Sequence, residues 1–136
     1  MEICIDFDGT CVTHDYPEIG KSIGAESVLK DLVENGHQLI LFTMRSDRDV
    51  LVDGMLYQET FLTDALLWFK KNNIPLYGVQ ANPTQTEWTN SPKAYAQLYI
   101  DDAALGCPLI YPDDKQERPY VDWKKVREML SVLQLI

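Results

Sequence analysis

The sequence is poor in positive charge. Its 136 residues include 12 Lys and Arg against 21 Asp and Glu, which gives a formal net charge of −9. Nucleic acids are bound through basic faces that neutralise their phosphates, so we expect no nucleic-acid partner. An acidic chain can still bind small phosphates if clustered acids hold a divalent cation, because the cation reverses the local field.

Cysteine and long apolar runs are also scarce. The three cysteines have no metal-ligand spacing and indicate reduced thiols, as in a cytoplasmic protein. No apolar run approaches the ~20 residues that span a bilayer, and the start of the chain lacks the basic and apolar regions of a signal peptide. We therefore expect a cytoplasmic protein with no membrane partner. Residues 1–136 are enough for a single domain with its own core.

The apolar segments that are present predict an α/β fold. Continuous apolar runs predict buried strands at residues 2–6, 38–43, 76–80, 98–100 and 109–111. Helices are predicted over 25–35 and 60–72, from 92 to 96 as the start of a short helix, and from 123 onward. Strands that alternate with helices and are apolar throughout are typical of a mainly parallel sheet with helices on both faces. Residues 11–24 are expected to form a loop or small hairpin, and residues 46–59 remain ambiguous.

Polar side chains follow three of these strands. Asp6 and Asp8 follow the first, Thr43 follows the second, and the pair Asp101-Asp102 follows the strand at 98–100. The carboxyl ends of parallel strands lie at one edge of a sheet, and ligands of open α/β sheets bind there. The spacing therefore predicts one site assembled from distant parts of the chain.

The residue types at this edge suit phosphoryl chemistry. An Asp carboxylate such as Asp6 can attack phosphorus and form an acyl-phosphate. A second carboxylate, Asp8, can protonate the leaving oxygen and later activate water. Two acids alone would repel a phosphoryl group, so we expect Mg²⁺, which prefers carboxylates, waters and substrate oxygens. Asp101 or Asp102 would complete its ligands.

Other polar residues are candidates to bind the phosphoryl group. Lys93 could offset the carboxylate charge, and the hydroxyl of Thr43 could hold a phosphoryl oxygen. Arg45 could bind the substrate phosphate or instead pair with Asp47 or Asp49. His14 lies just beyond the first two acids and could line the site.

Four segments together resemble the haloacid-dehalogenase (HAD) superfamily of aspartyl phosphotransferases. The segment 6–10, Asp-Phe-Asp-Gly-Thr, matches the nucleophile motif DxDGT. Thr43 closing a strand, Lys93 ahead of the next motif, and the acidic pair Asp101-Asp102 match the remaining three motifs in order. The resemblance implies a three-layer, Rossmann-like fold and Mg²⁺-dependent hydrolysis of a phosphate monoester.

The resemblance also implies individual roles. Asp6 would be the nucleophile and a metal ligand, and Asp8 the general acid/base that binds metal through its backbone carbonyl. Asp102 would bind metal directly, with Asp101 acting through water or orienting Lys93. Many members carry a large cap domain, for which this chain has no room. A capless or minimally capped protein with an open site is therefore implied.

Short capless relatives linked to capsule or surface-sugar biosynthesis suggest a small-molecule phosphate ester, such as a sugar phosphate, as substrate. A homo-oligomer in which a neighbouring subunit acts as lid is also compatible with the missing cap. Two alternatives to hydrolysis stay open. One is phosphoryl transfer to an acceptor other than water. The other is a non-catalytic module on the same fold that binds phosphates or a protein.

Overall fold

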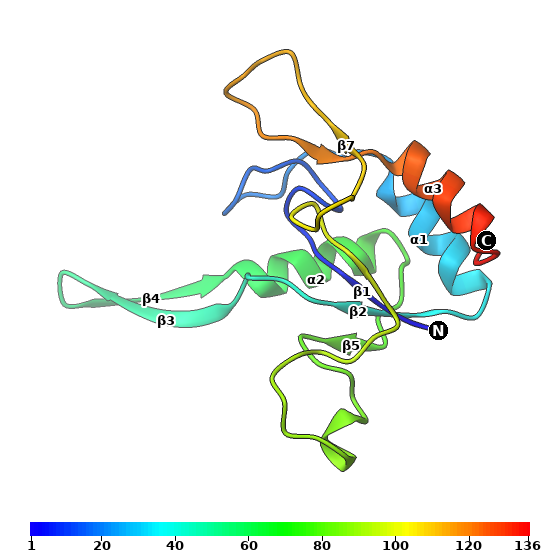
Figure 1. The fold of residues 1–136 in the computed structure, drawn as a ribbon. Helices are drawn as coiled ribbons and strands as arrows, with labels where there is room; N and C mark the ends of the chain where they lie inside the picture. The colour runs from blue at the N-terminus through cyan, green and yellow to red at the C-terminus, as the bar shows by residue number, and fades with distance from the viewer.

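The computed structural model describes residues 1–136, and it is a mixed α/β structure (Figure 1). The elements in chain order are β1 (Glu2–Ile5), α1 (Ala25–Glu34), β2 (Gln38–Leu41), β3 (Asp47–Val52), β4 (Met55–Thr60), α2 (Phe61–Lys71), β5 (Gly78–Val79), the 3-10 helix η1 (Gln85–Glu87), β6 (Leu98–Ile100), β7 (Leu109–Ile110), β8 (Tyr120–Val121) and α3 (Trp123–Val132). None of the helices has the length and apolar character needed to cross a membrane.

Four of the expected strands form one parallel sheet in the order β5-β2-β1-β6. β1 is central, and its residues pair in register with β2 on one side and β6 on the other, so that Ile5 lies between Leu41 and Ile100. This confirms the parallel sheet. The expected strand at 109–111 also forms, as β7, but it pairs antiparallel with β8 outside the main sheet.

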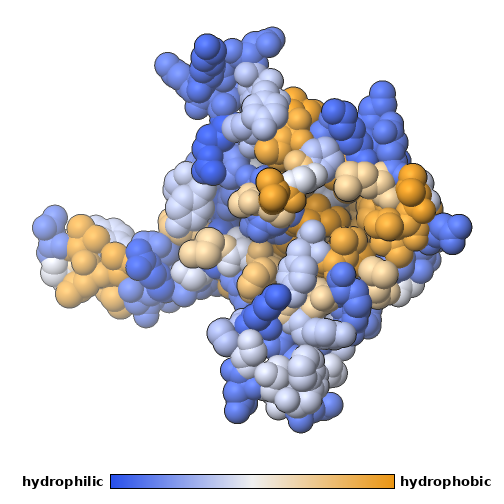
Figure 2. Space-filling model, in the orientation of Figure 1, coloured by the Kyte–Doolittle hydropathy of each residue, from blue (hydrophilic) through white to orange (hydrophobic).

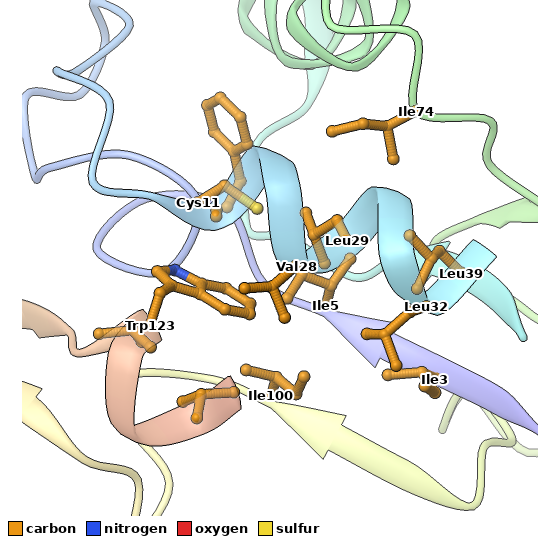
Figure 3. Packing of buried hydrophobic residues seen from close by; sticks show 14 of the residues in the cluster. Ile3, Ile5, Cys11, Val28, Leu29, Leu32, Leu39, Ile74, Ile100 and Trp123 are labelled. Atoms are coloured by element: carbon orange, nitrogen blue, oxygen red, sulfur yellow. The ribbon is translucent and has the colours of Figure 1, made fainter. Parts of the chain in front are cut away.

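The helices cover only one face of the sheet, which corrects the expectation of helices on both faces. Side chains of α1, α2 and α3 join the same-facing Ile3 and Ile5 of β1 and Leu39 and Leu41 of β2 in one core cluster (Figure 3). The opposite face carries only a small cluster of Cys4, Ile40 and Ala94. In Figure 1 the segment between β5 and β6 lies on that side.

The segment 80–97 takes the place of a helix, and the helix predicted to start at 92–96 does not form. The buried Gln85 holds this segment together, because its side chain accepts from the N–H groups of Asn82 and Tyr95 and donates to the carbonyls of Ser91 and Lys93. One amide side chain thus satisfies four backbone groups that a helix would have paired internally. Prolines at 83 and 92 interrupt the helical ladder in addition.

The ambiguous segment 46–59 forms a two-stranded arm, β3 and β4, that projects from the body (Figure 1). Its two-residue turn, Asp53-Gly54, has positive φ at both positions, 50° and 76°. That conformation matches the twist of a tight hairpin, and Asp-Gly is a favoured sequence for it. Asp47 fixes the base of the arm to α2 by accepting from the N–H and hydroxyl of Thr63.

Candidate functional site

The sequence-predicted residues from three strands meet in one cavity of about 470 Å³ at the carboxyl ends of β1, β2 and β6. Six of them line it, namely Asp6, Asp8, Thr43, Arg45, Asp101 and Asp102. His14, Tyr16, Met44, Ala103 and Arg118 complete the lining. The cavity is within the usual size range of small-molecule sites.

The turn after β1 directs the acids of segment 6–10 into this cavity. The N–H of Asp6 still bonds the carbonyl of Ile100 at 3.0 Å, so the strand continues to its first carboxylate. The chain then turns at Gly9, whose φ is 79°. A Cβ on Gly9 would lie 1.9 Å from His14 Nε2 and 2.6 Å from Asp102 Oδ2. Glycine is therefore required both by its conformation and by the close approach of the two side chains.

Three carboxylates form a compact cluster inside the cavity. One oxygen from each of Asp6, Asp101 and Asp102 lies within 4.8 Å of the others, which is a spacing that could hold a metal ion. The buried hydroxyl of Thr10 links two of them, being 2.8 Å from Asp6 Oδ2 and 3.2 Å from Asp102 Oδ1. It also accepts from the N–H of Asp102 at 3.0 Å. Thr10 thus joins β1 to the loop after β6 at the centre of the site.

Burial raises the pKa of Asp6 from its ordinary value of 3.8 to about 8, and the negative charge of Asp101 and a hydrogen bond with Asp102 add to this effect. The hydrogen bond from Thr10 opposes it. No basic side chain pairs with Asp6, because Arg45 bonds Asp8 and His14 Nε2 lies 2.7 Å from Asp102 Oδ2. A cation bound beside Asp6 would favour its ionised form.

Arg45 is engaged by the protein itself, which is against its predicted role as a substrate-phosphate ligand. Nε and Nη2 bond the two carboxylate oxygens of Asp8, each at 2.8 Å. The remaining donors reach the carbonyls of Pro17, Glu18 and Phe61 at 2.8–3.2 Å. The side chain is 1% exposed, and all five of its N–H donors are used. Arg45 instead fixes Asp8 and ties it to the loop after β1 and to the start of α2.

Thr43 retains the geometry that its predicted role requires. Its Oγ1 accepts from the N–H of Arg45 at 3.1 Å, so the hydroxyl proton is left to donate into the cavity. Gln80 holds the Thr43 backbone from both sides, accepting from its N–H at 2.9 Å and donating to its carbonyl at 2.7 Å. Gln80 was not identified from the sequence, because a lone Gln after a strand carries no recognisable signal.

Lys93 lies outside the cavity, contrary to the prediction that it binds the phosphoryl group. It is exposed, and its Nζ lies 5.6 Å from the centre of the Tyr99 ring. The reason is its position just ahead of β6. The N–H of Gln97 bonds Glu2, the first residue of β1, so this segment enters the sheet at the amino end of its strands. The cavity is at the other end.

Two other basic residues line the cavity. His14 was a candidate from its place in the sequence and does reach the acidic cluster through Asp102. Arg118, from the loop between β7 and β8, was missed, since an arginine in a polar loop far from any motif gives no signal. Arg118 forms no ion pair and also lines an adjoining polar cavity of about 130 Å³ with Lys21 and Tyr120. It is therefore the arginine of this site whose charge is unpaired.

Comparisons with known proteins give one informative relationship. No family model matches the chain, and no curated protein matches it significantly. Among solved structures, it is similar to a conserved protein from Bacteroides thetaiotaomicron, with 31% sequence identity and a TM-score of 0.70. The similarity covers 96% of this chain and 89% of that one. The chain therefore belongs to the same protein family as this conserved Bacteroides thetaiotaomicron protein.

Proposed function

We propose that the chain hydrolyses a small phosphate monoester through an aspartyl-phosphate on Asp6, with Mg²⁺ as cofactor and a HAD-type arrangement of its site. The observation that carries this proposal is the convergence of Asp6, Asp101 and Asp102 within 4.8 Å beside the free hydroxyl of Thr43. Asp6 is central among these groups and has open access to the cavity, as a nucleophile requires.

The donor set fits Mg²⁺. The clustered donors are all carboxylate oxygens, which are the ligands that Mg²⁺ uses together with water and substrate oxygens. Burial raises the pKa of Asp6, and a cation bound beside it would offset that effect by favouring the carboxylate. Asp6, Asp101 and Asp102 would hold the ion, and when bound it would neutralise phosphoryl oxygens and favour the ionised form of Asp6.

The proposed reaction has two displacements at phosphorus. First, an Asp6 carboxylate oxygen bonds to phosphorus while the bond from phosphorus to the ester oxygen breaks, and the alcohol leaves with a proton. Water then attacks the acyl-phosphate, releasing inorganic phosphate and restoring Asp6. Asp8, which Arg45 fixes in place through both carboxyl oxygens, is the proposed general acid and base: it gives its proton to the leaving alcohol in the first step and takes a proton from the attacking water in the second.

Thr43 and Arg118 are the proposed contacts to the phosphoryl group. Thr43 offers a hydroxyl donor, and Arg118 offers an unpaired guanidinium, which suits phosphate recognition better than an ammonium does. Arg118 thus takes the part that the sequence assigned to Lys93 and Arg45. With only about 470 Å³ available, the cavity suits a small ester such as a sugar phosphate.

The test is phosphate release from a panel of phosphate monoesters, with Mg²⁺ or with a chelator. We expect Mg²⁺-dependent turnover that Asp6→Asn abolishes and that Asp113→Asn, an exposed acid on the β7–β8 loop, leaves unchanged. Transfer of phosphate to a second labelled product would indicate a phosphotransferase. Binding of phosphate and Mg²⁺ without turnover of any ester would contradict hydrolysis and support the non-catalytic module.

A further inference from the structure

The β3–β4 arm exposes large apolar side chains that its own chain does not cover. At its tip Leu51, Val52, Met55, Leu56 and Tyr57 are 49–70% exposed. They come from both strands and both faces, because Leu51 pairs with Leu56 while Val52 pairs with Met55. Figure 2 shows this apolar tip at the end of the projecting arm. A free two-stranded ribbon is marginally stable in water, so a surface that covers the tip would stabilise the arm.

A second uncovered apolar surface lies at the other end of the molecule. Two adjoining hollows, of about 230 Å³ and about 640 Å³, run between β6, the segment 104–108 and α3. They share Met129 and Leu133, which are 50% and 58% exposed, and Leu105 lines the first and Val132 the second. We call these two hollows the α3 groove. β6 beside it is the last strand of the sheet, so one edge of its backbone has no neighbouring strand.

We propose that the arm tip of one copy of this chain docks in the α3 groove of a second copy. The two surfaces cannot meet within one molecule, because the arm and α3 project from opposite ends (Figure 1). Each is apolar at its centre, and one contact between copies would cover both. A β-ribbon also suits a site bordered by an open strand edge.

The charges around the two surfaces are complementary. The arm, residues 47–60, holds four acids and one Arg, which gives it a net charge of −3. In an acidic chain α3 is an exception, with Lys124, Lys125 and Arg127 against Glu128. Arg127 pairs with Asp31 of α1, so the exposed Lys124 and Lys125 against Glu128 leave a net charge of +1 for the arm to meet. Lys125 and Glu128 both line the groove. Opposite charges favour the arm-to-groove contact over an arm-to-arm contact, in which two acidic ribbons would meet.

The contact is head-to-tail, and this sets the form of the assembly. Such an interface leaves a free arm at one end and a free groove at the other, so it extends into a chain or closes into a ring. Five half-exposed side chains bury on the order of 500 Å² per partner, at the low end for specific interfaces. We therefore expect assembly that increases with concentration rather than a permanent dimer.

The test uses analytical ultracentrifugation of the full chain from low-micromolar to submillimolar concentration. We expect the mass to rise with concentration for the unmodified chain and for Leu67→Asp, a control at a 54% exposed leucine of α2. Leu56→Asp in the arm and Leu133→Asp in the groove should each stay monomeric. Both side chains are more than half exposed, so neither change should unfold the protein.

Mixing the two monomeric variants gives the decisive result. Leu56→Asp retains an intact groove and Leu133→Asp an intact arm, so the mixture should form a dimer of one copy of each and nothing larger. An unmodified chain that remains monomeric at all concentrations would overturn the proposal. So would assembly of Leu133→Asp alone, which would indicate arm-to-arm contact, or a mixture that stays monomeric. None of these outcomes depends on the proposed phosphatase activity.

Discussion

Replacing Asp6 with asparagine should separate the electrostatic cost of this carboxylate from its chemical role. In the folded chain the pKa of Asp6 is raised from 3.8 to about 8, so folding favours its protonated form. The stabilisation is complete below the unfolded value of 3.8 and is lost as the pH rises toward about 8. The asparagine side chain of the variant cannot ionise, and its amide occupies nearly the same volume as the carboxyl group.

The free energy of unfolding of the native chain should therefore fall relative to Asp6→Asn as the pH rises. At about 1.4 kcal/mol per pH unit, the difference should grow by at most about 4 kcal/mol between about pH 5 and about pH 8. Urea unfolding in the presence of a chelator measures this difference. Adding Mg²⁺ at the higher pH should restore stability to the native chain and much less to Asp6→Asn, because a ligand stabilises only the state that binds it.

Asp113→Asn is the matched control, since it removes an exposed carboxylate and should unfold like the native chain at both pH values. A difference between Asp6→Asn and the native chain that is equal at the two pH values would refute the reasoning. It would mean that burial does not hold the Asp6 proton in the folded state. That result would also remove the main electrostatic reason for a cation at this cluster.

Three further predictions follow from single contacts. Arg118→Ala should raise the KM for a phosphate ester about tenfold, the lower limit for losing a hydrogen bond to a charged group. Lys93→Ala should change the steady-state kinetics little, because Lys93 is outside the cavity. Equal effects of the two substitutions would contradict this assignment. Gly9→Ala should lower the free energy of unfolding by about 1–3 kcal/mol more than Gly54→Ala does. Both glycines have positive φ, but of the two only Gly9 lacks space for a Cβ. Equal losses for the two variants in urea unfolding would show that the side chains around Gly9 move aside freely. Trp123→Phe should lower the free energy of unfolding by about 1–3 kcal/mol, because the buried carbonyl of Thr10 loses the 2.7 Å hydrogen bond that the indole N–H donates. An unchanged melting temperature in thermal unfolding would contradict a structural role for that bond.

Local patterns in the sequence predicted those elements whose cause is local. Helix α1 ends where Gly36, with φ of 86°, allows the N–H of His37 to bond Leu32. Asp122, the residue before the helix predicted from 123 onward, accepts from the N–H of Lys125 and caps the start of α3. Each signal acts within a few residues, so it can be read without knowledge of the fold.

The errors in the predicted elements came from nearby contacts that the apolar periodicity does not signal. The prolines of segment 80–97 argued against a long helix, but only the folded chain brings Gln85 against four backbone groups of that segment. The β3–β4 hairpin was not predicted from the sequence, because its strands are acidic and neither face of the arm is buried. Apolar and polar residues therefore do not alternate along these strands as they do in a half-buried sheet. A turn signal at Asp53-Gly54 was present and could have indicated the hairpin.

The sequence by itself determined which acids meet, because apolar runs that end in Asp or Thr must present those side chains at one edge once the strands are parallel. It could not determine which basic residues accompany them. Arg45 and Lys93 are near the motifs in sequence, yet the tertiary structure turns Arg45 inward to Asp8 and leaves Lys93 outside the cavity, beside the Tyr99 ring of β6. Arg118 reaches the cavity from a distant loop. Long, flexible side chains take their position from the packing around them, and that packing exists only in the folded chain.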